Sequence, residues 1–219
     1  MYIFILTIDR LSWDAVDNIL LSFVSSEQKQ KILSYHNPAD MKRSLYAILL
    51  VKMIINKMTD VPVSEISFSY GIYGKPYLTS FPNFHFNLSH TKNRILCCIN
   101  TTHSIGVDIE YLRDAPLNIM NLSFHDCEKK YVDSATITTC RNLRFFKIWT
   151  QKEAYTKYLG TGLTLSTTEF NTLDPQYSNH FLSWSDNIFV YSIYSDSVSI
   201  DHFEELYSLE MCNYYLKQH

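Results

Sequence analysis

The sequence predicts an α+β fold, and three observations lead to this prediction. The 219 residues are 46% hydrophobic and 15% aromatic, which is enough apolar surface for a compact core. Two long segments, residues 38–58 and 141–159, have apolar side chains at the spacing of a helix face. Short strand-like runs separated by turn residues accompany each segment, and this combination is typical of helices that cover small antiparallel sheets.

The first 60 residues predict one strand and two helices. The apolar run in the opening MYIFILTIDR is typical of a strand. Ser25 and Gln28 have the spacing of a capping box and predict a short helix that begins beside them. Asn37-Pro38 predicts a longer helix that continues to about Met58, since proline is compatible with a first helical turn.

Residues 66–100 predict two pairs of strands. A turn at Gly74-Lys75-Pro76 separates a strand over residues 66–73 from a brief return at Tyr77-Leu78. The second pair is expected over Phe84–Leu88 and Arg94–Asn100, and the connection between its strands contains Ser89, His90 and Thr91.

The second half begins after a polar connector, Asn100–Ser104, which predicts a boundary between subdomains 1–103 and 104–219. A strand is expected over Gly106–Glu110 and a helix near His125. A longer helix over about 141–159 is expected to stop at Gly160 and Gly162, followed by strand-like runs to about residue 200 and a short closing helix.

Composition limits the possible functions. A net charge of −3 argues against a nucleic-acid-binding protein that relies on overall positive charge. The five cysteines lack metal-finger spacing, which indicates reduced thiols that serve as small core residues. The opening apolar run is too short for a signal peptide or a membrane span. We therefore expect a cytoplasmic protein without nucleic-acid or membrane partners.

Three carboxylates form a candidate metal site. Asp108 and Glu110 lie two residues apart on the predicted strand IGVDIE, so they share one face while Val107 and Ile109 point inward. Glu153 lies on an otherwise aromatic helix stripe, where an ionised group needs a cation or hydrogen bonds. Such oxygen ligands suit Mg²⁺. The alternative for the strand pair alone is a solvated sheet edge.

Several residues are candidate phosphate ligands. Lys75 lies in the Gly-Lys-Pro turn, and Ser89 and His90 offer a hydroxyl and an imidazole at the end of a predicted strand. A Ser/His nucleophilic pair is disfavoured, because neighbours on an extended chain point in opposite directions and no G-x-S-x-G elbow surrounds the serine. Each of these residues also has a structural interpretation: Lys75 as an exposed turn residue, Ser89 as a capping residue and His90 as a packed side chain. Lys152 and Lys157 also fit ordinary helix ion pairs.

Four motifs occur in one order along the chain: GKPYL, FNLSH, IGVDIE and WTQKEAYTKYLGTGL. Together their spacings resemble the 4′-phosphopantetheinyl transferase superfamily, in particular the surfactin-synthetase-activating type. The resemblance covers residues 1–165. It implies a pseudodimer of two similar α+β subdomains on one chain, which works as a monomer.

The resemblance also implies a reaction, in which the 4′-phosphopantetheine arm of coenzyme A moves to a serine of an apo acyl or peptidyl carrier protein and 3′,5′-ADP leaves. Mg²⁺, with Mn²⁺ as an alternative, would be held by Asp108, Glu110 and Glu153. Glu153, or Glu128 through a water, would accept the serine proton, and Lys157 would act at the pyrophosphate. The residues implied to contact coenzyme A are Lys31, Arg43, Ser44, Lys75, Ser89, His90, Lys152 and Lys157.

Two parts of the chain match the family pattern less clearly than the four motifs do. Gln28 stands beside Lys29 where the family commonly has a lysine for the 3′-phosphate. A second apolar stretch matches the variable region with which the family docks its carrier protein, and it contains Leu117, Met120, Leu122 and Phe124. The alternative interpretation of this stretch is a helix that packs into the protein's own core.

Two other functions remain open at this point. One is a different Mg²⁺-dependent phosphate enzyme, such as a phosphohydrolase, that uses the same carboxylates. The other is a catalytically silent module that binds coenzyme A or a carrier protein; the intact acidic and lysine positions argue against it. The pathway of the carrier, whether fatty-acid, polyketide or nonribosomal-peptide synthesis, is not indicated by the sequence.

Overall fold

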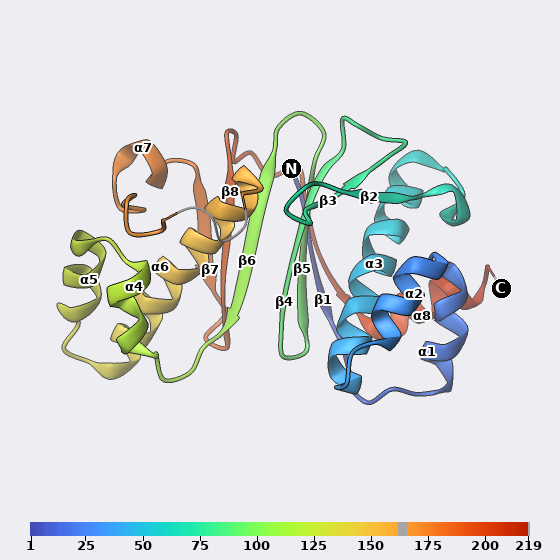
Figure 1. Ribbon diagram of the computed structural model, residues 1–219, viewed down its shortest axis with the longest axis horizontal. Helices are drawn as coiled ribbons and strands as arrows, with labels where there is room; N and C mark the ends of the chain where they lie inside the picture. Colours follow the sequence, from blue (N-terminus) through green and yellow to red (C-terminus); the bar gives the residue numbers. More distant parts are fainter. Residues whose placement is uncertain (162–165, 219) are drawn as a thin grey trace.

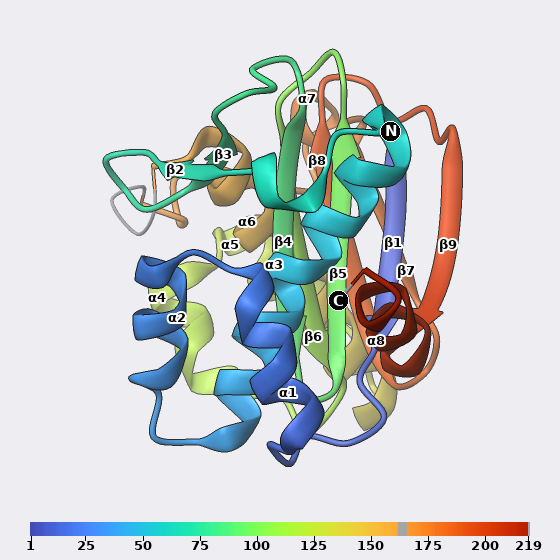
Figure 2. The ribbon, with the colours of Figure 1, turned by 90° about the vertical axis from the view of Figure 1, so that its right-hand side faces the viewer.

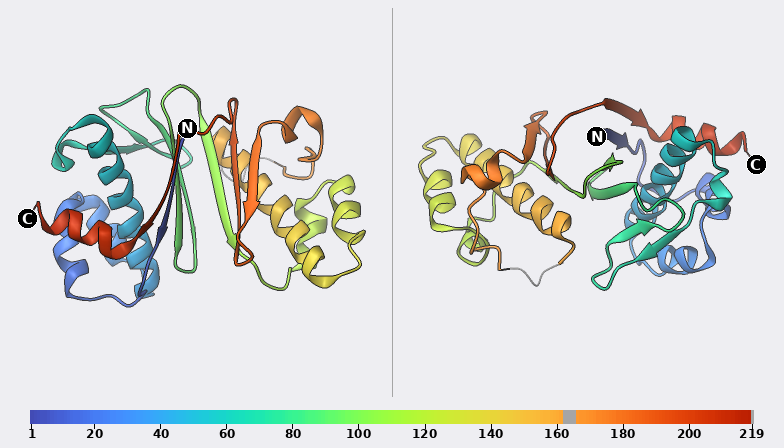
Figure 3. Two further views of the ribbon diagram at one scale, coloured as in Figure 1. Left: turned by 180° about the vertical axis from the view of Figure 1, so that it is seen from behind. Right: turned by 90° about the horizontal axis from the view of Figure 1, so that it is seen from above.

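The computed structural model describes residues 1–161 and 166–218, and it has four layers (Figure 1). Helices of the first half cover one face of a four-stranded sheet, and the other face of this sheet packs on a three-stranded sheet. Helices of the second half cover the far face of the smaller sheet. The view from above shows the two helical layers outside and the sheets between them (Figure 3). The predicted α+β class is confirmed.

The first half contains three helices. Two of them, α2 and α3, begin where the sequence predicts, and α1 was not predicted. Its elements are β1 (Tyr2–Thr7), α1 (Ala15–Leu20), α2 (Ser26–Leu33), α3 (Pro38–Thr59), β2 (Phe68–Tyr70), β3 (Pro76–Leu78), β4 (His85–Thr91) and β5 (Arg94–Asn100), with 3₁₀ turns at Leu21–Phe23 and Val63–Glu65. Ser25 and Gln28 form the predicted capping box of α2, and Asn37 caps α3. Both helices therefore start at side chains that satisfy first-turn N–H groups.

The second half is built around one long helix. Its elements are β6 (Ile105–Tyr111), a 3₁₀ turn (Leu117–Ile119), α4 (Met120–Ser123), α5 (Asp126–Asp133), α6 (Thr138–Leu159), α7 (Pro175–Ser178), β7 (Phe181–Ser185), β8 (Phe189–Ser195), β9 (His202–Tyr207) and α8 (Ser208–Leu216). Helix α6 ends at Gly160, which has a φ of 68° and closes the helix in the left-handed conformation, as predicted. Gly162, the second predicted stop, lies outside the described residues.

The four-stranded sheet corrects the predicted extent of the second subdomain. Its order is β4-β5-β1-β9, and β9 pairs in parallel with β1, with Tyr2 opposite His202 and Thr7 opposite Tyr207 (Figure 2). Helix α8 then packs into the core of the first half. The final strand and helix thus belong structurally with residues 1–100, and the sheet is not wholly antiparallel. Local pattern cannot reveal such a partner, because pairing of strands this far apart in sequence is a tertiary event.

The β4–β5 hairpin corrects a second prediction. Strand β4 continues to Thr91, so Ser89 and His90 belong to the strand, and the turn falls at Lys92 and Asn93. Lys92 has a φ of 49°, in the left-handed region that a tight turn requires. The predicted strand over residues 66–73 is also shorter than expected, at Phe68–Tyr70.

No helix among residues 1–161 and 166–218 is both long enough and apolar enough to cross a membrane.

Candidate active site

Strand β6 presents its acidic residues to helix α6. Ile105, Val107 and Ile109 lie in the core between the two sheets, as the predicted alternation requires. The opposite face of the strand therefore carries Asp108 and Glu110 toward α6, which packs against it (Figure 1).

Gly106 allows α6 to approach β6 closely. A Cβ atom at this position would lie 2.0 Å from the carbonyl oxygen of Ala154 and 2.3 Å from the backbone nitrogen of Tyr158. This close approach brings the carboxylate and lysine side chains of α6 beside the acidic face of the strand. Our sequence reasoning gave Gly106 no role, although a glycine inside a strand is a signal for close backbone approach.

Asp108 is the buried centre of the site, with only 4% of its surface exposed. Its Oδ1 accepts hydrogen bonds from Ser89 Oγ at 2.7 Å and from Lys157 Nζ at 2.6 Å. Its Oδ2 is buried and has no hydrogen-bond partner among the described residues. Buried polar atoms almost always have partners, so this oxygen marks a place for a group that the protein itself does not supply.

Glu110 and Glu153 add negative charge beside Asp108. Burial, and then the Asp108 charge, raises the pKa of both carboxyls above the ordinary value. In the described part of the chain, no three His, Cys, Asp or Glu side chains are close enough together to hold a metal ion as they stand. The donor set nevertheless fits a hard divalent cation, because it consists of carboxylate oxygens and includes the unpartnered Oδ2.

Strand β4 brings residues of the first half to the same place. Asn87 Oδ1 accepts a hydrogen bond of 2.8 Å from the backbone nitrogen of Val107, which joins β4 to β6 across the two sheets. Ser89, two residues later, reaches Asp108 from the same face of β4. His90 points the other way, so the disfavoured Ser/His nucleophilic pair has no geometric support. Sequence reasoning missed Asn87, although it lies within the FNLSH motif.

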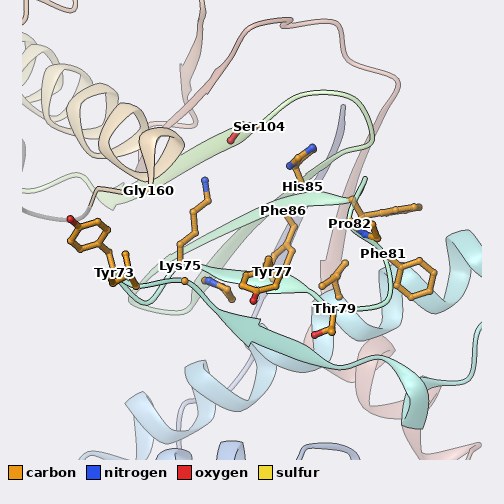
Figure 4. Close-up of a pocket in the computed structure, with 15 residues that line it drawn as sticks. Tyr73, Lys75, Tyr77, Thr79, Phe81, Pro82, His85, Phe86, Ser104 and Gly160 are labelled. Carbon is orange, nitrogen blue, oxygen red and sulfur yellow. The ribbon is translucent and has the colours of Figure 1, made fainter.

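Lys75 connects the β2–β3 hairpin to the second half. Figure 4 shows its side chain extending from the hairpin toward Gly160 and Ser104. Its ammonium donates to the carbonyl oxygens of Tyr158, at the end of α6, and Ile105, at the start of β6. A positive charge there stabilises the carbonyl end of the helix. Burial lowers the pKa of Lys75 to about 8.

Two adjacent cavities open around Lys75. A cavity of about 300 Å³ lies between the β2–β3 hairpin, β4 and α6, and Glu153, Thr156 and Lys157 line it. A second cavity of about 600 Å³ lies behind the hairpin, and its lining includes Tyr73, Tyr77, Phe81, Phe84 and Phe86 (Figure 4). Lys75 and Gly160 line both cavities, so the acidic cluster opens onto a continuous cleft between the halves.

The remaining candidates of the first half lie on α2, α3 and β4, and none of them lines either cavity. The Arg43 guanidinium donates to the carbonyl oxygen of Lys92 and is paired with Asp40. Desolvation, followed by the positive charges of Arg43 and Lys157, lowers the pKa of His90. Lys31 lies 5.5 Å from the centre of the Tyr70 ring. Ser44 is half-buried on α3.

Glu128 and Lys152 do not join the cluster, which corrects their predicted roles. Glu128 is completely buried, and its Oε2 forms an ion pair with Lys152 Nζ at 2.8 Å. It also accepts hydrogen bonds from the backbone nitrogen and hydroxyl of Thr172. Lys152 precedes Glu153 by one residue, and one residue turns the helix by about 100°, so Lys152 points away from the cleft into this internal ion pair.

Fold and site together define an α+β protein with an acidic cleft between its two halves, which Lys75 and Lys157 line. The family model of the 4′-phosphopantetheinyl transferase superfamily matches residues 104–212, and a model described as 4′-phosphopantetheinyl transferase, N-terminal, matches residues 12–101.

The chain is also similar in sequence to individual proteins that are named 4′-phosphopantetheinyl transferases. The chain is 33% identical over 155 residues to 4′-phosphopantetheinyl transferase gsp of Aneurinibacillus migulanus, covering 71% of this chain and 64% of the relative. It is 32% identical over 177 residues to 4′-phosphopantetheinyl transferase ffp of Bacillus subtilis, and 30% identical over 172 residues to Sfp of Bacillus subtilis strain 168, covering in each case 78% of this chain and 75% of the relative. The chain belongs to the 4′-phosphopantetheinyl transferase superfamily. It spans just under two thirds of the first relative and three quarters of the other two.

Proposed function

We propose that this protein transfers the 4′-phosphopantetheine arm of coenzyme A to a serine of an apo acyl or peptidyl carrier protein. The observation that carries the proposal is the unpartnered Oδ2 of Asp108, a buried residue that is paired with Lys157 through Oδ1 and that raises the pKa of the Glu110 and Glu153 carboxyls through its charge. Membership of the superfamily supports the same reaction. Fatty-acid, polyketide and nonribosomal-peptide carriers are all candidate acceptors.

Asp108, Glu110 and Glu153 are the residues that we propose to hold Mg²⁺, with Mn²⁺ as the alternative ion. When bound, the ion would supply positive charge to the pyrophosphate oxygens as the phosphoryl group is transferred.

The cleft residues have separate tasks in this proposal. Lys157 neutralises charge on the pyrophosphate, and Lys75 binds a phosphate of coenzyme A. Lys31, Arg43, Ser44, Ser89 and His90 are the further residues that we propose to contact the coenzyme. Glu153 accepts the proton of the attacking serine, since its raised pKa makes it a stronger base than an ordinary carboxylate. The serine oxygen bonds to the β-phosphorus, the bond from that phosphorus to the bridging oxygen breaks, and 3′,5′-ADP leaves with this oxygen.

The reaction is tested by incubating the pure protein with coenzyme A, Mg²⁺ and a panel of apo-carrier domains, and then measuring carrier masses. We expect one phosphopantetheine to be added, and we expect a Ser→Ala change in the carrier to prevent the addition. Consumption of coenzyme A without any carrier would identify a hydrolase. Binding of coenzyme A without modification of any carrier would identify a silent binding module.

Lys75 makes coenzyme A binding dependent on pH. Because its pKa in the free protein is about 8, the ammonium is charged below this pH and neutral above it. We expect kcat/KM for coenzyme A to fall as pH rises through about 8, and kcat at saturation to change less, since bound phosphate keeps Lys75 charged. Lys75→Arg is expected to remove this fall, because arginine stays protonated. The same pH profile in both proteins would contradict the assignment.

The predicted carrier-docking stretch is mostly internal. Met120 and Phe124 are buried in the core of the second half, and Leu117 packs against it. Leu122 differs, with 80% of its surface exposed. We therefore narrow the proposed docking surface to the area around Leu122.

Leu122→Asp tests this surface. We expect KM for an acidic carrier to rise about tenfold, the effect of roughly 1.4 kcal/mol, while KM for coenzyme A stays unchanged. Leu209→Asp is the matched control, because Leu209 is also exposed but lies on α8. An equal effect of both variants, or no effect of Leu122→Asp, would contradict docking at α4.

We also propose that the protein works as a monomer in the cytoplasm. The cysteines are free thiols, which agrees with a reducing compartment. Their positions correct one expectation, since two of them are not core residues: Cys97, Cys98 and Cys212 are buried, whereas Cys127 and Cys140 are exposed.

A further inference from the structure

The two halves carry matching pairs of helices that are offset by 100 residues. Helices α2 and α5 each have eight residues and each begin with a capping box, whose third helical residue is Gln28 in α2 and Glu128 in α5. Helices α3 and α6 each have 22 residues, with Lys52 and Lys152 at the same position along them. The pair Gln28 and Lys52 is therefore the structural counterpart of the pair Glu128 and Lys152.

In the second half, this pair is electrically neutral and fully bonded. The Lys152 ammonium lies 2.8 Å from the Glu128 carboxylate. It also donates to the carbonyl oxygens of Thr167 and Phe170. All three N–H groups of this buried cation therefore have an acceptor within the protein.

In the first half, the counterpart lacks its anion. Lys52 is only 5% exposed, and its ammonium donates one hydrogen bond, to the carbonyl oxygen of Val63 at 3.1 Å. Among the described residues no carboxylate pairs with it. Gln28 is also buried and uses its Oε1 to accept the capping hydrogen bond from Ser25, so its amide nitrogen remains as a further donor. A buried ammonium with two unused N–H groups is costly unless an anion or other acceptors reach it.

A cavity of about 270 Å³ adjoins this lysine. It lies between α2, the middle of α3 and the segment that leads into β2, and both Lys52 and Gln28 line it. Ser22, Ser64 and Ser67 line it as well, as does Glu27, which is an exposed residue. The cavity has room for several waters or a small ion, and it shares no lining residue with the two cavities of the cleft.

We propose that this cavity binds a small oxyanion such as phosphate or sulfate, separately from the substrates in the cleft. The anion takes the place that the Glu128 carboxylate occupies in the second half and accepts hydrogen bonds from Lys52 and the Gln28 amide. Waters alone would satisfy the N–H groups but would leave the buried charge uncompensated. The inference does not depend on the proposed transferase reaction.

The test compares the thermal stability of three proteins in inorganic phosphate and in sodium chloride of equal ionic strength. For the wild type, phosphate at ten times its dissociation constant is expected to raise Tm by roughly 3–6 °C through the bound state. Phosphate also stabilises proteins non-specifically, but this contribution is common to all variants. Lys52→Met is expected to lose the rise in Tm that comes from phosphate bound in the cavity. Lys57→Met is expected to keep this rise, because Lys57 is an exposed residue on the same helix.

Gln28→Glu provides a second and independent variant. It restores the carboxylate that the second half has, so we expect a higher Tm in chloride and no specific phosphate effect. Equal phosphate effects in wild type and Lys52→Met, or an undiminished effect in Gln28→Glu, would overturn the proposal. The measurement is repeated with saturating coenzyme A. A phosphate effect that persists supports a separate anion site, and one that disappears shows that the cavity serves the coenzyme.

Discussion

Gly106→Ala is expected to reduce kcat/KM for coenzyme A about 100-fold and to destabilise the protein. The added Cβ would meet backbone atoms of α6 at 2.0 and 2.3 Å, and backbone cannot rotate away as a side chain can. Helix α6 must therefore move away from β6. We expect a loss of about 3 kcal/mol in the free energy of unfolding, which lowers Tm by roughly 6–12 °C in a protein of this size. Displacement of Glu153 and Lys157 by about 1 Å accounts for the loss of activity.

Gly71→Ala is the matched control for this variant. Its added Cβ would meet only the carbonyl oxygen of Lys75, at 3.6 Å, which is an ordinary contact, and its φ is not in the left-handed region. We expect nearly unchanged activity and Tm. Calorimetry and initial rates at 25 °C measure both quantities. Wild-type stability in Gly106→Ala would contradict the close packing of α6 on β6.

Asp108→Asn is expected to lower kcat/KM about 1,000-fold with little change in the shape of the site. The amide has the volume of the carboxylate, but it removes the charge that holds Lys157 and that we propose to bind Mg²⁺. In the wild type, Mg²⁺ should raise Tm, because an ion that binds only the folded state stabilises it. The variant should lose this rise. A normal Mg²⁺ response in Asp108→Asn would show that Asp108 is not a ligand.

Glu153→Gln separates charge from structure at the same site. Its activity should also fall, but the metal-free variant should be more stable than the wild type at neutral pH. The reason is that the folded-state pKa of Glu153 is raised, so the ionised carboxylate costs stability once the pH exceeds its unfolded pKa. We therefore expect the Tm of the metal-free variant to be higher than that of the wild type. Below pH about 4 the carboxyl is protonated in both states, and the difference should vanish.

Local sequence signals predicted most elements of the fold. The capping box at Ser25 and Gln28, the Asn37-Pro38 start of α3 and the Gly160 end of α6 are each confirmed. These signals work because a helix terminus is decided by hydrogen bonds among residues within a few positions of each other. The hairpin at Lys92 was placed too early, since Ser89 and His90 are equally compatible with a strand and with a loop.

The candidate site was only partly visible from the sequence. Alternation along IGVDIE correctly placed Asp108 and Glu110 on one face, and the helical register placed Glu153 and Lys157 together on another. The same register could not show that Lys152 turns inward to Glu128. It also gave no indication that Leu122 alone of the proposed docking residues is exposed, because the partner surface that buries the others lies elsewhere in the chain.

The sequence by itself determined the α+β class, the helix termini, the faces of β6 and α6 and the motifs of the superfamily, because each depends on residues near one another in the chain. Only the tertiary structure decided that β9 joins the first sheet and that Gly106 lets α6 reach β6. It also decided that one Asp108 oxygen stays without a partner and that Lys52 faces a cavity without the carboxylate that Lys152 has. These features arise where distant segments meet, and their cost or stabilisation depends on burial and charge that no single segment encodes.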